Sequence, residues 1–136
     1  MEKDRHYIQL CSEDSKERYP ENEVTNFTSE LPEPLYLKGE WEMALMEAVY
    51  NKDLHSPYYS MYILCDICED NIVHNNVRPI LRKMTREPFL KVPIFVNVKS
   101  EFIQRIRISM VDSKLRPLKN VSGGFSCSLL LRRKGI

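Results

Sequence analysis

The sequence predicts an all-β fold: an antiparallel two-sheet β-sandwich, a single domain of about eight strands over residues 1–136. Short runs rich in β-branched and aromatic residues alternate apolar and polar side chains, which is typical of strands with one buried face. Clusters of Pro, Gly, Asn, Asp or Ser separate these runs, roughly every 8 to 15 residues. Signals for helix starts and stops are scarce. At 136 residues the chain fits one domain with one core.

The first two strands are expected at residues 5–11 and 24–31, joined by a charged loop over residues 12–23. Pro32 and Pro34 follow the second strand. Because proline has no N–H to donate to a strand ladder, this pair excludes a central strand at that point.

Residues 40–50 follow a turn at Lys38-Gly39 and could form a helix or a strand by propensity alone. Alternation favours a strand whose inward side chains are Trp41, Met43, Leu45 and Val49, with Glu47 as an exception. The opposite face is also apolar at Ala44, Met46 and Ala48. We therefore expect a neighbouring loop or a partner to cover that second face.

Five further strands are expected in the rest of the chain, at residues 58–68, 77–84, 92–98, 102–111 and 125–132. Period two predicts three sets of inward side chains: Met61, Ile63, Cys65 and Ile67; Phe102, Ile106, Ile108 and Met110; and Phe125, Cys127, Leu129 and Leu131. Gly123-Gly124 is interpreted as a turn or bulge, because it lacks the context of a phosphate-binding loop.

Composition and charge narrow the classes of function. The net charge of +1 combines twelve acidic and five basic residues in positions 1–50 with seven acidic and fifteen basic residues afterwards. The basic residues are dispersed, which argues against nucleic-acid binding. No apolar stretch approaches the roughly 20 residues that cross a bilayer, and the first residues lack the apolar core of a secretion signal. We expect a protein of the cytosol or nucleus that is not secreted and has no membrane partner.

Catalytic and metal-binding chemistry finds little support. Cys65 and Cys68 have the C-x-x-C spacing of zinc and redox sites, but on a strand residues three apart point to opposite faces. Without an intervening turn the two thiols would diverge, and we interpret them as buried structural cysteines. His6, His55 and His74 lie far apart in sequence. We therefore expect no enzyme, no cofactor and no metal, although a thiol or zinc enzyme built on the cysteine pair remains a third hypothesis.

The residues best suited to protein contacts are tyrosines and arginines. Tyr58, Tyr59 and Tyr62 are candidate anchors, because tyrosine gives a large contact area at low entropic cost. The candidate rim charges are basic side chains and the acidic segment of residues 13–23; the basic ones are Arg105, Arg107 and Arg132.

Two groups of motifs resemble a known family. The first contains Tyr19-Pro20-Glu21-Asn22, Asn26-Phe27-Thr28, Leu31-Pro32, Gly39, Trp41-Glu42 and Leu45, and the second contains Tyr62-Ile63, Cys65-Asp66-Ile67 and Arg116-Pro117. Together they resemble the penton-type minor capsid protein of Polinton/Maverick elements and adintovirus-like viruses. Members of that family have a longer segment where this chain has only residues 51–57.

The resemblance implies a single jelly roll with eight strands in two four-stranded sheets. It also implies a structural virion protein that forms rings, expected to be pentamers, at the fivefold vertices of an icosahedral capsid. Its partners would then be further copies of itself and a double-jelly-roll major capsid protein. The alternative is a transposon-derived intracellular adaptor, a β-sandwich that binds a protein or peptide.

Overall fold

The computed structural model of the chain describes residues 4–51, 60–85, 90, 92–118 and 123–135. Ten strands lie in this part of the chain: β1 Arg5–Cys11, β2 Asn26–Tyr36, β3 Trp41–Val49, β4 Ser60–Cys65, β5 Asn71–Val73, β6 Asn76–Arg78, β7 Ile80–Thr85, β8 Val96–Asn97, β9 Phe102–Asp112 and β10 Ser126–Arg133. A helix long and apolar enough to cross a membrane is not found among the residues described.

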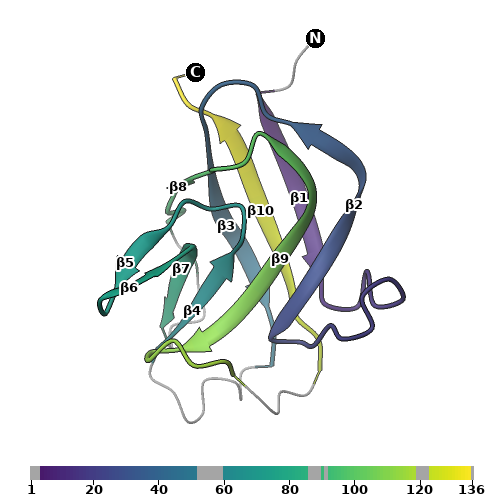
Figure 1. Cartoon of the computed structure of the whole chain (residues 1–136), viewed down its shortest axis with the longest axis vertical. Coiled ribbons are helices and arrows are strands. Elements are labelled where there is room, and N and C mark those ends of the chain that lie inside the picture. Colours follow the sequence, from purple (N-terminus) through teal and green to yellow (C-terminus); the bar gives the residue numbers. More distant parts are fainter. Residues whose placement is uncertain (1–3, 52–59, 86–89, 91, 119–122, 136) are drawn as a thin grey trace.

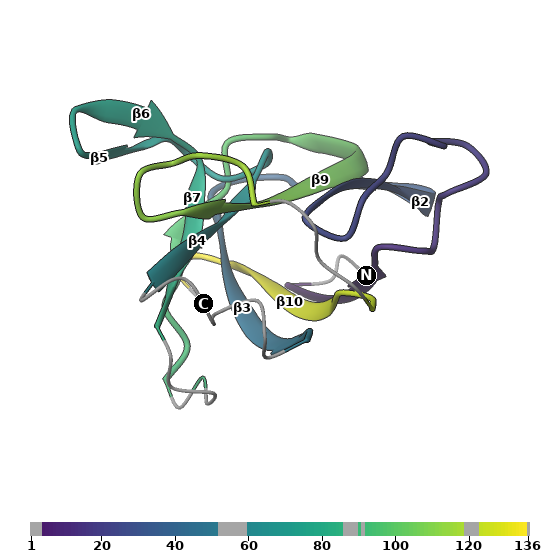
Figure 2. The same ribbon diagram turned by 90° about the horizontal axis from the view of Figure 1, so that it is seen from below.

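Eight of the strands form two four-stranded antiparallel sheets that face each other (Figures 1 and 2). Sheet A has the order β1-β10-β3-β8 and sheet B the order β2-β9-β4-β7, while β5 and β6 form a separate hairpin. Among the eight, the first strand pairs with the last, the second with the seventh, the third with the sixth and the fourth with the fifth. This pairing is that of a jelly roll, the fold that the family resemblance implied, with one added hairpin.

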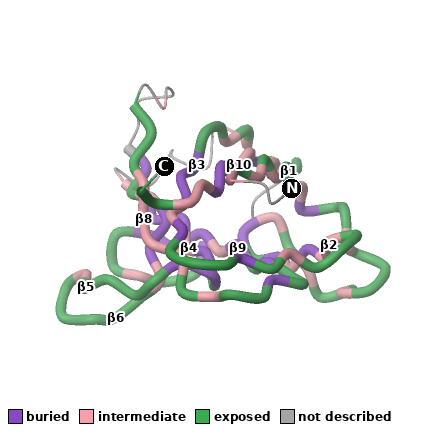
Figure 3. The backbone as a smooth tube through the Cα atoms, turned by 90° about the horizontal axis from the view of Figure 1, so that it is seen from above, coloured by how far each residue is buried: buried purple, intermediate pink, exposed green. Residues whose placement is uncertain are grey.

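The core lies between the two sheets and consists of the inward side chains of both. Figure 3 shows along the backbone which residues are buried. The largest fully buried side chains come from both halves of the chain and include Phe27, Met43, Leu45, Met61, Ile63, Ile106, Ile108 and Phe125. The predicted inward sets are confirmed in β4 and in β10, and in the middle of β9. Alternation succeeds there because one face of each strand contacts the opposite sheet.

A bulge in β3 changes which side chains point inward. Residues 40–50 form a strand, as predicted, with Trp41, Met43 and Leu45 buried. The register with β10 shifts between Leu45 and Glu47, leaving Met46 without an opposite residue. The extra residue reverses the alternation, so Val49 is 55% exposed and its predicted inward position is wrong. On the second face Ala44 is buried but Met46 is exposed, so that face is covered only in part.

A second irregularity lies between β2 and β9. β2 extends to Tyr36 through both prolines, so the predicted end at residue 31 is wrong. The prolines are accommodated because β2 is an edge strand and the register shifts between Glu30 and Leu35. The same irregularity leaves Gln104 and Arg105 both exposed. Phe102 is therefore 48% exposed rather than inward as predicted.

Three predicted strands in the second half have different bounds. β4 ends at Cys65 rather than 68, and the strand expected at 77–84 is divided at Pro79 into β6 and β7. The strand expected at 92–98 shrinks to the two residues of β8, whose ladder with β3 has only two residue pairs. The β5–β6 hairpin was not expected from the sequence.

Candidate interaction surfaces

The structure changes the assignment of the predicted tyrosine anchors. Tyr58 and Tyr59 lie outside the described residues. Tyr62 is only 7% exposed, so the prediction of an exposed anchor at this position is wrong. It packs with Ile80 and Val111 in a small apolar cluster of its own, against which Leu64, Val73 and Leu115 are packed.

Of the three predicted arginines, two are held by neighbours. Arg107 is exposed, but its Nε donates a hydrogen bond to Asn26 Oδ1 at 2.9 Å. Arg132 is half-buried, its Nε lies 2.7 Å from Glu42 Oε1, and its guanidinium carbon lies 3.5 Å from the centre of the Phe95 ring. Only Arg105 is an exposed positive charge with no partner among the described side chains.

The loop between β1 and β2 covers the open edge of β2. The side chain of Asn22 pairs with the backbone of Thr28 twice, accepting from its N–H at 3.0 Å and donating to its C=O at 2.9 Å. Ser15 Oγ accepts the N–H of Glu30 at 3.0 Å, and the hydroxyl of Tyr19 donates to the Glu30 carboxylate at 2.7 Å. These bonds occupy backbone groups that would otherwise be free to pair with another chain.

The residues that carry the family resemblance fall into two structural roles. Core positions are Phe27, Trp41 and Leu45, which are at most 3% exposed, and Leu31, which is partly buried against them. Tyr19 belongs to the loop that covers β2, Pro20 beside it and Pro32 within β2 are exposed, and Gly39 turns the chain into β3 with a φ of +92°. That φ strongly favours glycine over residues with a side chain.

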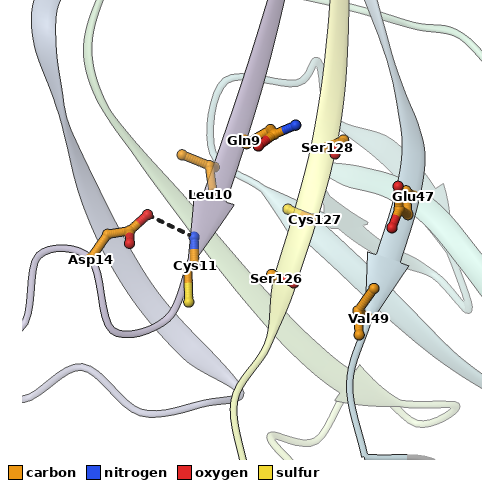
Figure 4. Close-up of a pocket in the computed structure, with 9 residues that line it drawn as sticks. All are labelled: Gln9, Leu10, Cys11, Asp14, Glu47, Val49, Ser126, Cys127 and Ser128. Carbon is orange, nitrogen blue, oxygen red and sulfur yellow. Dashed lines mark hydrogen bonds between the residues drawn. The ribbon is translucent and has the colours of Figure 1, made fainter.

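A shallow polar depression of about 380 Å³ lies over β1, β10 and β3 on sheet A (Figure 4). Its lining includes Gln9, Cys11, Asp14, Glu47 and Ser128, and Asp14 Oδ2 accepts the backbone N–H of Cys11 at 3.0 Å. A second depression of about 410 Å³ lies between the β1–β2 loop and β9, next to Arg107. Both are open, and only the first is lined mainly by polar groups. An open depression suits contact with another protein surface better than enclosure of an apolar ligand.

The cysteine pair is arranged differently from the prediction. Asp66 and Ile67 form a turn, in which the Cys68 N–H donates to the Cys65 C=O at 3.1 Å. The two thiols therefore meet instead of diverging. A hydrogen bond with Cys68, and then burial, raises the pKa of the Cys65 thiol well above its usual range.

Both thiols are fully buried, as predicted, and Cys68 Sγ lies 3.4 Å from Met43 Sδ. A raised thiol pKa opposes formation of the thiolate that nucleophilic chemistry needs. No group of three or more His, Cys, Asp or Glu side chains suited to a metal ion occurs within the described ranges.

The histidines do not assemble into a site in the part of the chain that is described. His6 stacks on Trp41 with ring centres 5.4 Å apart, and His74 lies in the turn of the β5–β6 hairpin. His55 lies outside the described residues.

Two exposed apolar features were missed by the sequence reasoning. The β5–β6 hairpin exposes Ile72 and Val77, and the ends of β2 and β9 expose Tyr36 and Phe102. The signal for the first was two short β-branched runs around His74-Asn75. The second has no clear signal, because it depends on the irregular register between β2 and β9.

Comparison of the sequence with protein-family models and with curated proteins gives no match.

Proposed function

We propose that this protein is a non-enzymatic structural subunit, a penton-type minor capsid protein that forms rings at the vertices of an icosahedral shell. The observation that carries the proposal is the pairing of first strand with last, second with seventh, third with sixth and fourth with fifth. It gives a single jelly roll, the fold that the resemblance to Polinton and adintovirus-like penton proteins implies.

A fold by itself does not define a function, so the proposal also relies on surface features. Edge β2 is covered by its own loop, which disfavours assembly through strand addition at that edge. Exposed apolar side chains instead occur on both sides of the molecule, on the hairpin before β7 and on β2 with β9. Two different contact surfaces per subunit are what a closed ring requires.

The test is the oligomeric state of the purified chain, measured by size-exclusion chromatography with light scattering and by negative-stain electron microscopy. We expect a ring of uniform size, alone or after mixing with a double-jelly-roll shell protein from the same genome. A chain that stays monomeric at high concentration, and forms no larger species with the shell protein, would refute the proposal. That result would favour the adaptor hypothesis.

Charge supplies a second readout. If Arg105 and the acidic residues 13–23 lie on the rims of neighbouring subunits, association should slow when the screening length falls to about 8 Å near physiological salt. Arg105→Glu should weaken association without lowering the melting temperature of the monomer, because the side chain is exposed.

A further inference from the structure

We propose that the β5–β6 hairpin of one copy docks onto the exposed aromatic pair Tyr36 and Phe102 of a second copy. This inference depends on the proposed self-association and names the two surfaces that carry it. The hairpin extends away from both sheets on the side of β7, whereas β2 lies at the opposite side of sheet B (Figures 1 and 2).

The hairpin is locally ordered by its own turn. His74 and Asn75 have φ values of 48° and 64°, and two consecutive positive values define the type I′ turn whose twist matches two-residue hairpins. The Asn76 side chain donates to the His74 C=O at 3.1 Å. Next to the turn, Val73 packs against the cluster of Tyr62, Ile80 and Val111. An ordered hairpin loses little conformational entropy on binding.

The exposed side chains of the hairpin form one apolar contact. Ile72 and Val77 are directly opposite each other across the two strands, so they lie on the same face. They are 79% and 58% exposed. Branched apolar side chains at a cross-strand pair on a projecting element are typical of a contact that a partner covers.

The receiving surface is the aromatic patch, defined as Tyr36 and Phe102. These residues are opposite each other on β2 and β9, and their ring centres are 4.9 Å apart. Tyr36 is 77% exposed and Phe102 48%. Exposed tyrosine and phenylalanine rings are enriched at protein interfaces, where they supply large rigid area.

Exposed charges of both signs lie near each surface in the sequence: Asp70 and Arg78 at the hairpin, and Lys38, Glu33 and Glu101 at the patch. Arg78 follows Val77 on the hairpin, is exposed, and donates to the Val77 C=O at 3.2 Å. Glu33 and Glu101 precede Tyr36 and Phe102 in the sequence, are exposed, and have no ion-pair partner among the described side chains. Opposite charges at the rim would orient the two copies without providing most of the affinity.

The two surfaces lie on different sides of the subunit, so the contact is heterologous: each copy offers its hairpin to one neighbour and its patch to the other. Such a contact forms a ring when the rotation closes and a filament when it does not.

The experiment uses two double variants, one for each surface. Ile72→Asp with Val77→Asp removes the apolar hairpin face, and Tyr36→Ser with Phe102→Ser removes the patch. All four side chains are exposed, so both variants should keep the melting temperature of the wild-type monomer. The matched control is Val92→Asp with Ile94→Asp, which changes two exposed apolar side chains that belong to neither surface.

Each double variant should weaken self-association by about tenfold or more in sedimentation velocity, the scale for loss of an interface anchor, whereas the control should associate like wild type. A mixture of the two variants should form 1:1 dimers and nothing larger, because only one competent hairpin–patch pair remains.

Rings of wild-type size formed by either double variant, or a mixture of the two variants that forms no dimers, would overturn the docking while leaving the proposed function intact. A wild-type chain that associates neither alone nor after mixing with the shell protein would overturn both.

Discussion

Trp41→Ala is the most direct test of the core. Trp41 is 3% exposed, stacks on His6, and donates its indole N–H to the Lys38 C=O at 3.0 Å. Truncation of a buried aromatic side chain costs about 3 to 5 kcal/mol. The lost hydrogen bond adds little, because Lys38 is exposed and water can replace the donor. We therefore expect Trp41→Ala to lower the free energy of unfolding by about 4 kcal/mol. This is a large part of the free energy of unfolding of a typical domain, which is about 5 to 15 kcal/mol.

The free energy of unfolding would be measured by urea titration followed by circular dichroism. Trp41→Phe is the matched control, since it keeps an aromatic ring in the core and removes only the N–H and the second ring; about 1 to 2 kcal/mol is expected. Trp41 is the only tryptophan, so the emission maximum of the wild type reports on this one site. Emission typical of a solvated indole, or a loss below about 1 kcal/mol for Trp41→Ala, would refute the reasoning.

Three further predictions concern the edge, the thiols and a turn. Asn22→Ala should lower stability by about 1 to 2 kcal/mol and increase aggregation, because two hydrogen bonds to edge β2 are lost; unchanged thermal unfolding and light scattering would contradict this. A thiol reagent at pH 8 should modify only Cys11 in the native protein and all four cysteines in denaturant, because Cys65, Cys68 and Cys127 are buried. Burial, together with the neighbouring Cys11, also raises the pKa of the Cys127 thiol to about 12. Rapid modification of a second native thiol would argue against the buried arrangement. Burial raises the pKa of Asp112, but hydrogen bonds from the Arg116 and Lys114 amides and the Arg116 side chain outweigh it and leave that pKa below its usual value. A carboxyl whose pKa is lower in the folded state than in the unfolded state stabilises the fold at pH values above its unfolded-state pKa. The difference in free energy of unfolding between wild type and Asp112→Asn should therefore be full above about pH 4 to 5 and shrink as the pH falls further. A difference that stays constant down to about pH 2 would refute this prediction.

The parts of the fold that were predictable are those where the sheets contact each other over several residues. In β4 and in the middle of β9, each second side chain enters the core, and Met61 and Ile63 or Ile106 and Ile108 follow that period. Such a pattern depends only on the two faces of a strand, which the sequence displays directly.

The errors occurred where a single residue changes the register or another element covers a face. One extra residue, Met46, reverses the alternation of β3, and nothing in its side chain marks it as a bulge. Tyr62 lies on the outer face of its strand and would be exposed if Val73 and Leu115 did not pack against its cluster. The turn that joins the two thiols consists of Asp66 and Ile67, and a single Asp inside an otherwise apolar run is a weak turn signal.

The candidate surfaces were less predictable than the core. Arg105 could be identified from its polar position in an alternating strand, and it is exposed. Arg132 has the same pattern but finds Glu42 on the neighbouring strand, a contact that requires knowledge of the register. The hairpin turn uses His74-Asn75 instead of the Asn-Gly or Asp-Gly that usually signals a type I′ turn.

The pairing of β1 with β10 has a consequence for how the protein is made. Arg5 and Arg132 are opposite each other in the same ladder, so β1 leaves the ribosome long before β10, the strand with which it pairs. β10 also lies between β1 and β3, so these two strands cannot be joined into sheet A until β10 has been synthesised. Folds dominated by such distant pairings form slowly, because the loop must close before its contacts stabilise it. A nascent chain therefore holds the inner faces of β1 and β3 uncovered until Arg133 has emerged, and a chaperone that shields apolar strands would act during that interval.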